Sequence, residues 1–77
     1  MTDEDRLHNL EAQAETAYDK MYDARDPSGA GVCYSDAKEA LYDAIGLARK
    51  LGKADDVARL ERRLAHIKAV FRSQFAG

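Results

Sequence analysis

The sequence is poor in cysteine, proline and tryptophan, of which cysteine alone could link parts of the chain covalently. It contains one cysteine, one proline and no tryptophan in 77 residues. One cysteine cannot form a disulfide within the chain, which is typical of proteins in a reducing cytoplasm. A chain of this length buries only about 60% of the surface that its unfolded form exposes, so a partner or self-association would add useful stability. We expect a single helical domain, residues 1–77, that binds another protein or itself as a homodimer.

Long apolar runs are also missing. No run approaches the roughly 18 residues of a membrane-spanning helix, and the N-terminal stretch MTDEDRLHNL is acidic where a signal peptide is basic and then apolar. These features predict a cytoplasmic protein without a membrane partner. The sequence also shows no grouping of a nucleophile with a histidine and an acid, and its core is too small to hold perturbed acids in a dry pocket. We therefore predict no enzymatic activity and no cofactor.

Apolar residues recur at intervals of three and four in three segments, which is the period of an amphipathic α-helix. We expect helices at about 3–25, 35–51 and 54–75. No segment alternates as a strand does. The predicted fold class is all-α, a small three-helix antiparallel bundle with a Gly/Pro loop between helices 1 and 2 and a tight turn between helices 2 and 3. The apolar stripe of the first helix alternates large and small residues and suits a helix of the same chain or of a second copy: Leu7, Leu10, Ala14, Ala17, Met21 and Ala24.

Several residues indicate where these helices begin and end. Thr2, followed by three acids, is a candidate N-cap for the first helix. Pro27 restricts the residue before it, so this helix should end near Arg25. Ser35 is the candidate N-cap of the second helix, and Gly52 follows its last apolar residue.

Charge is distributed unevenly along the chain. Residues 1–26 carry eight acids and three bases, residues 27–52 carry three of each, and residues 53–77 carry three acids and six bases. An acidic first helix attracts a basic last helix, so we expect pairing within the molecule, worth at most about 1 kcal/mol for each exposed pair.

The run YSDAKEALYDAIGLARKLGKADD, residues 34–56, has small and large apolar residues at fixed helical spacing: Tyr34, Ala37, Leu41 and Ala44. This run resembles the second helix of a tetratricopeptide repeat and the turn after it, with Tyr22 in the place of the aromatic residue of the repeat's first helix. The resemblance implies a protein-binding role without catalysis.

The stretch DPSGAGVCYSD, residues 26–36, contains the only proline and the only cysteine. A phosphate-binding loop would need a preceding strand and a Gly-Lys-Ser/Thr ending, which this stretch lacks. Cys33 is a candidate reactive thiol because it would lie just before a helix N-terminus, although a free cysteine is more often a small buried apolar residue. We interpret the stretch as a loop, whose length makes Gly29 and Gly31 candidate partner contacts.

Glu4, His8, Glu11 and Glu15 share one face of the first helix, a spacing that can bind a metal. A complete site would need matching ligands from another helix. We therefore favour a solvated acidic face and predict no metal.

The third helix has a basic strip opposite its apolar stripe, formed by Arg59, Arg62, Arg63 and His66. Such a strip attracts phosphate backbones, so nucleic-acid binding is the alternative function, although a net charge of −2 argues against it.

Tyr42 and Gly46 lie on the polar side of the second helix. Exposed tyrosine is enriched at binding hot spots, and a glycine inside a helix admits a close neighbour, so both are candidate partner contacts. The leading prediction is a small, non-catalytic protein–protein interaction or regulatory module.

Overall fold

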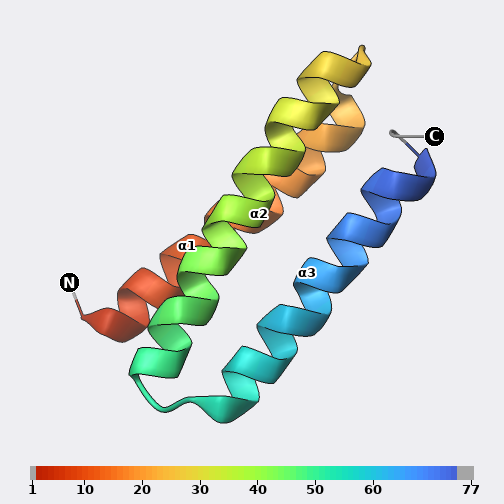
Figure 1. Cartoon of the computed structure of the whole chain (residues 1–77). Helices are drawn as coiled ribbons and strands as arrows, with labels where there is room; N and C mark the ends of the chain where they lie inside the picture. The colour runs from red at the N-terminus through yellow and green to blue at the C-terminus, as the bar shows by residue number, and fades with distance from the viewer. Residues whose placement is uncertain (1, 75–77) are drawn as a thin grey trace.

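The structure is a computed structural model that describes residues 2–74, and it consists of three α-helices in antiparallel order (Figure 1). They are α1 (Asp3–Asp23), α2 (Pro27–Lys50) and α3 (Ala54–Gln74). No strand is present within residues 2–74. The predicted all-α, three-helix fold is therefore confirmed, while the predicted end of the third helix at residue 75 lies outside the described residues.

The N-terminus of α1 is capped as the sequence predicts. The Thr2 hydroxyl accepts a hydrogen bond from the Asp5 backbone N–H at 3.1 Å, and the Asp5 carboxylate accepts one from the Thr2 backbone N–H at 3.3 Å. This reciprocal pair is a capping box, which satisfies two otherwise unpaired donors. At its other end α1 stops at Asp23, two residues earlier than predicted, because Ala24 has extended backbone dihedrals.

The predicted Gly/Pro loop at residues 26–34 is wrong. Pro27 begins α2, so this stretch supplies the first turns of a helix of 24 residues, and Ser35 lies inside that helix. The physical reason is that Asp26 acts as the N-cap: its Oδ1 accepts a hydrogen bond from the Gly29 backbone N–H at 2.6 Å. Proline suits the first helical position because its φ is already helical and its missing N–H needs no partner there.

The predicted tight turn between helices 2 and 3 is confirmed. Gly52 has φ 72°, in the left-handed region that favours glycine, and it is the only described residue with positive φ. Its N–H donates to the Arg49 carbonyl at 3.1 Å, and the Lys53 N–H donates to the Ala48 carbonyl at 2.9 Å. These two bonds form a Schellman motif, which ends α2 and directs the chain into α3 after three residues.

Helix α2 is the central element, and both α1 and α3 pack against it. The buried residues of α1 and α2 are mostly alanines, which let two backbones approach closely, whereas α3 contributes Leu60, Leu64 and Ile67. In Figure 1 the ribbons of α1 and α2 overlap in this view, and α3 runs alongside α2 after the turn that joins them. Within residues 2–74, one connected cluster of buried side chains forms the centre of the core: Leu7, Ala14, Ala17, Ala37, Ala40, Leu41, Ala44, Ile45, Leu47, Ala48, Leu60, Leu64 and Ile67. Met21 and Ala30 are buried as well.

The apolar stripe of α1 packs mainly inside the chain's own bundle. Leu7, Ala14, Ala17 and Met21 are all buried within the chain's own bundle. Most of the stripe is therefore used within the chain, although Leu10 and Ala24 are only half-buried. Within the described residues, no helix is both long enough and apolar enough to cross a membrane.

Candidate functional site

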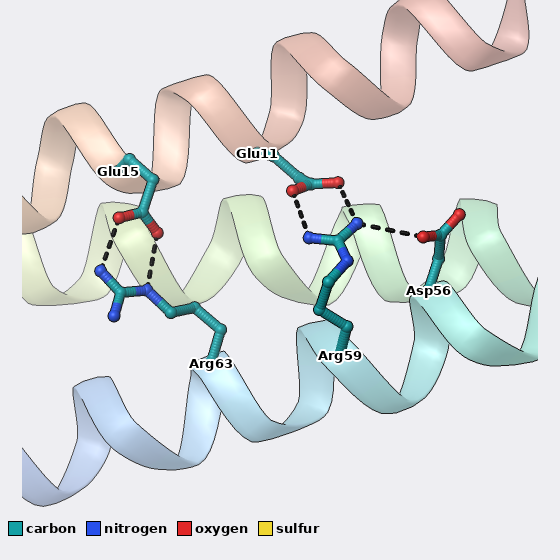
Figure 2. A network of polar contacts seen from close by, with 5 residues as sticks. All are labelled: Glu11, Glu15, Asp56, Arg59 and Arg63. Carbon is teal, nitrogen blue, oxygen red and sulfur yellow. Dashed lines mark hydrogen bonds and ion pairs between the residues drawn. The ribbon is translucent and has the colours of Figure 1, made fainter.

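The strongest polar feature of the molecule is a row of ion pairs that joins α1 to α3. The guanidinium of Arg59 donates two hydrogen bonds to Glu11, from Nη1 to Oε2 at 2.7 Å and from Nη2 to Oε1 at 2.8 Å (Figure 2). The same Nη2 donates to Asp56 one turn earlier on α3, at 3.1 Å. A two-pronged arginine–carboxylate contact fixes both distance and orientation, so it aligns the two helices.

A second contact of the same kind lies further along the two helices. Arg63 donates from Nε and Nη2 to the two carboxylate oxygens of Glu15, at 2.8 and 2.5 Å. Its guanidinium also lies over the ring of Tyr18, 4.8 Å from the centroid. At the other end of the row, Lys53 donates to Glu4 at 2.9 Å. The predicted attraction between an acidic first helix and a basic last helix is confirmed by these three links.

The pairing holds these groups in their charged forms. The hydrogen bond from Arg59 lowers the pKa of the Glu11 carboxyl below its ordinary value of 4.5. The matching bonds raise the pKa of Arg59, of Arg63 and of Lys53. Their common cause is a hydrogen bond to the charged form, which favours that form.

The structure divides the predicted basic strip of the third helix. Arg59 and Arg63 face α1 and are held by its carboxylates, while Arg62 and His66 are exposed to solvent. The prediction placed all four opposite the apolar stripe, but α1 lies along one flank of that stripe and takes two of the arginines. Two of the four candidate nucleic-acid contacts are thus already bonded to acids.

The acidic face of α1 is used in the same way. Glu4, Glu11 and Glu15 each accept hydrogen bonds from a base on or next to α3. In the part of the chain that the structure describes, no three His, Cys, Asp or Glu side chains are grouped so that they could hold a metal ion. The same pairs border a crevice of about 360 Å³, which is lined by four charged residues and two leucines: Glu11, Glu15, Arg59, Arg63, Leu41 and Leu60.

Tyr42 is 52% exposed, as the sequence predicts for the polar side of its helix. Its hydroxyl accepts a hydrogen bond from Lys68 Nζ at 2.9 Å, which lowers the pKa of Tyr42 and raises that of Lys68. Gly46 is exposed as well, and a Cβ built on it would meet no atom within 4 Å. No close approach within the chain therefore requires a glycine at this position.

Because residues 27–34 are helical, Cys33, Gly29 and Gly31 do not lie in a loop as predicted. All three lie within α2, and Cys33 is six residues after its first residue instead of just before a helix N-terminus. The helix-terminus argument for a reactive thiol at Cys33 therefore fails, and its side chain is half-buried. A Cβ on Gly29 would come within 3.2 Å of the Asp26 carboxylate that caps the helix, whereas Gly31 has open space.

A groove that the sequence does not predict lies between α1 and α2. The groove has a volume of about 660 Å³, and only these two helices line it, so it lies on a side of the pair that α3 does not cover. Small and polar side chains form its walls: Asn9, Ala12, Gln13, Thr16, Ala17, Lys20, Cys33, Asp36, Glu39, Ala40 and Asp43. One signal was present, namely the polar and small residues at helical spacing along α1, but it does not reveal which helix lies beside them.

The groove is acidic. Asp36, Glu39 and Asp43 line it with one base, Lys20. Within the described residues none of these three carboxylates makes an ion pair, in contrast to the carboxylates between α1 and α3. The groove therefore presents uncompensated negative charge around a floor of small side chains.

Comparison with known proteins gives no relative: no family model matches the chain, and no curated protein or solved structure shows significant similarity to it.

Proposed function

We propose that this protein is a small, non-catalytic interaction module that binds a helix of a protein chain in the groove between α1 and α2. The observation that carries the proposal is the groove itself, an open channel of about 660 Å³ between two antiparallel helices. Such a channel is the place where a further helix packs in a helical bundle.

The lining indicates what kind of helix fits. Ala12, Ala17 and Ala40 give the groove a floor without bulky side chains, so an incoming backbone can approach closely. Three unpaired carboxylates against one lysine favour a helix with basic residues, because charge complementarity selects partners and speeds their encounter. The expected occupant is therefore a helix with small residues and arginine or lysine on its contacting face.

Two observations favour this function over the alternatives. All buried side chains of the described residues are apolar, so none of them offers an ionisable group in a dry pocket for catalysis. For nucleic acid, Arg59 and Arg63 are already bonded to carboxylates, and the acidic groove would repel phosphates.

Affinity capture from an extract of the protein's own cells, with and without nuclease, tests the proposal when matched variants are included. Thr16→Arg places a large cation in the groove, whereas Ser35→Arg places the same cation on the exposed side of α2 outside it. We expect a captured protein chain, either another protein or an untagged copy of this one, to survive nuclease, to be retained by Ser35→Arg and to be lost with Thr16→Arg.

Equal capture by the two variants would contradict the proposal, because the captured chain would then bind elsewhere. Loss of the captured protein after nuclease would instead favour the nucleic-acid alternative. In that case Arg62→Glu should abolish retention on DNA or RNA, and retention should fall steeply with salt.

A further inference from the structure

The outer face of α3 is the side of that helix turned away from α1 and α2. Its exposed residues include three alanines at helical spacing, Ala58, Ala65 and Ala69, together with Arg62 and Arg72. Within the described residues neither arginine makes an ion pair, whereas Arg59 and Arg63 on the flank of the same helix do. This face, called here the α3 ridge, thus combines small side chains with unpaired positive charge.

The α3 ridge has the properties that the α1–α2 groove requires of its occupant. The groove has small residues on its floor and carries Asp36, Glu39 and Asp43, while the ridge has alanines and two arginines. Arg62 and Arg72 are about 15 Å apart along the helix axis, and Asp36 and Asp43 are about 10 Å apart. Arginine side chains are long enough to cover that difference.

We propose that the partner in the groove is a second copy of this chain, which inserts its α3 ridge. This inference rests on the proposed function, since it names the occupant of the same groove. Groove and ridge belong to different faces of one molecule, so the contact is heterologous: each copy gives its ridge to one neighbour and its groove to another. Repetition of such a contact builds a ring or an open chain and not a two-fold dimer.

A two-fold dimer through the groove is disfavoured by the same charges. Pairing two grooves would bring Asp36, Glu39 and Asp43 of one copy towards the same three acids of the other. Like charges brought together cost several kcal/mol. The acidic groove therefore calls for a basic surface.

The association should be weak. The lining residues of α1 span positions 9 to 20, which corresponds to about 16 Å of helix. A contact this short buries less than a standard protein–protein interface, so we expect a dissociation constant between about 10 µM and 1 mM. Because charge contributes, raising the salt concentration from about 50 to 500 mM should weaken it.

Sedimentation velocity of the purified full chain, at rising protein concentration and two salt concentrations, is the first experiment. The wild type should grow beyond a dimer at low salt. Thr16→Arg blocks the groove, and Arg62→Glu reverses a charge on the ridge, and each should weaken association at least about tenfold. Ser35→Arg and Lys50→Glu, which introduce the same charges outside both faces, should associate as the wild type does.

The mixture of the two blocked variants is the decisive measurement. Thr16→Arg keeps an intact ridge and Arg62→Glu keeps an intact groove, so equimolar mixing should restore one contact and produce a heterodimer that stops at two copies. Circular dichroism of each variant, showing unchanged helix content, excludes unfolding as the reason for lost association.

A wild type that stays monomeric to 1 mM at low salt, or a mixture that stays monomeric, would overturn the inference. The same variants distinguish a failure of this inference from a failure of the proposed function. If the purified protein is monomeric but Thr16→Arg still loses a captured protein from the extract, the groove binds a different chain, and only its identification as a second copy is wrong.

Discussion

Helix α1 touches its two neighbours in different ways. Towards α2 it presents alanines at zero or low exposure, such as Ala14 and Ala17, whereas towards α3 it presents glutamates that bind arginines two-pronged. The first contact depends on shape, since a closely packed seam has no room for larger side chains. The second contact depends on charge and carries specificity more than stability, because partly exposed ion pairs contribute little. The pair α1–α2 is therefore joined by close packing of small side chains, whereas ion pairs align α3 with α1.

The largest effect should come from the apolar part of the α3 contact. Leu60 is 1% exposed, so Leu60→Ala should lower the free energy of unfolding by about 2–5 kcal/mol, through lost burial and the cavity left behind. Leu60→Met, which conserves volume, should cost less than about 1.5 kcal/mol. Urea unfolding followed by circular dichroism measures both, and an equal cost for the two variants would contradict a tightly packed Leu60.

The next effect tests the close packing of alanines between α1 and α2 by adding side-chain volume instead of removing it. Ala44 is fully buried, so Ala44→Leu should destabilise the protein by about 1–3 kcal/mol through overpacking. The same change at Ala65 on the exposed side of α3 should stay within about 0.5 kcal/mol. The measurement is thermal unfolding at low protein concentration. A stabilising Ala44→Leu would show that the seam has unused space.

Removing one ion pair should have a smaller effect. Glu15→Gln should lower the free energy of unfolding by about 0.2–1 kcal/mol, because the pair with Arg63 is partly exposed. Glu39→Gln, at a carboxylate without an ion pair in the described residues, serves as the control and should change it less. Repeating the measurement at about 1 M salt should shrink the difference between the variants. A difference that does not depend on salt would point to lost packing instead.

The smallest effect concerns pH. The pKa of Glu11 is lowered in the folded state, so its contribution to stability is present above the ordinary value of 4.5 and is lost as pH falls through the folded pKa. The stability difference between the wild type and Glu11→Gln should therefore be constant near neutral pH and should disappear as the solution becomes strongly acidic. A difference that grows on acidification would contradict the sign of this shift.

Local signals correctly predicted two of the helix ends. Thr2 followed by acids predicted the cap of α1, and Gly52 predicted the end of α2. The net charges of the two outer helices predicted their pairing, although not that Arg59 and Arg63 would make it while Arg62 would not. A helical wheel gives the angle between side chains on one helix, but the direction of a neighbouring helix comes from the packing of all three.

The error at residues 26–34 has a related cause. Proline after a helix predicts the end of that helix, and the two glycines predict a turn, although Asp followed by Pro is equally typical of an N-cap and a first helical position. Ala30 is 1% exposed, so burial of these turns helps to offset the low helix propensity of Gly29 and Gly31. The groove was not predicted because its lining residues come from two helices, α1 and α2. Their relative register depends on the start of α2 at Pro27, which the sequence did not predict.

An odd number of helices has an electrical consequence. Two helices run in one direction and one in the other, so the dipoles of α1 and α2 largely cancel and that of α3 remains, on the order of 70 D for its 21 residues. At the end where α1 and α3 begin, acids in the first turns of both helices offset the positive N-terminal ends. Arg49 and Lys50 in the last turn of α2 offset the negative C-terminal end of that helix alone. At the opposite end, Lys20 and Arg72 lie in the last turns of α1 and α3. The molecule therefore has two electrically unlike poles, and it should orient in an external field even at the pH where its net charge is zero.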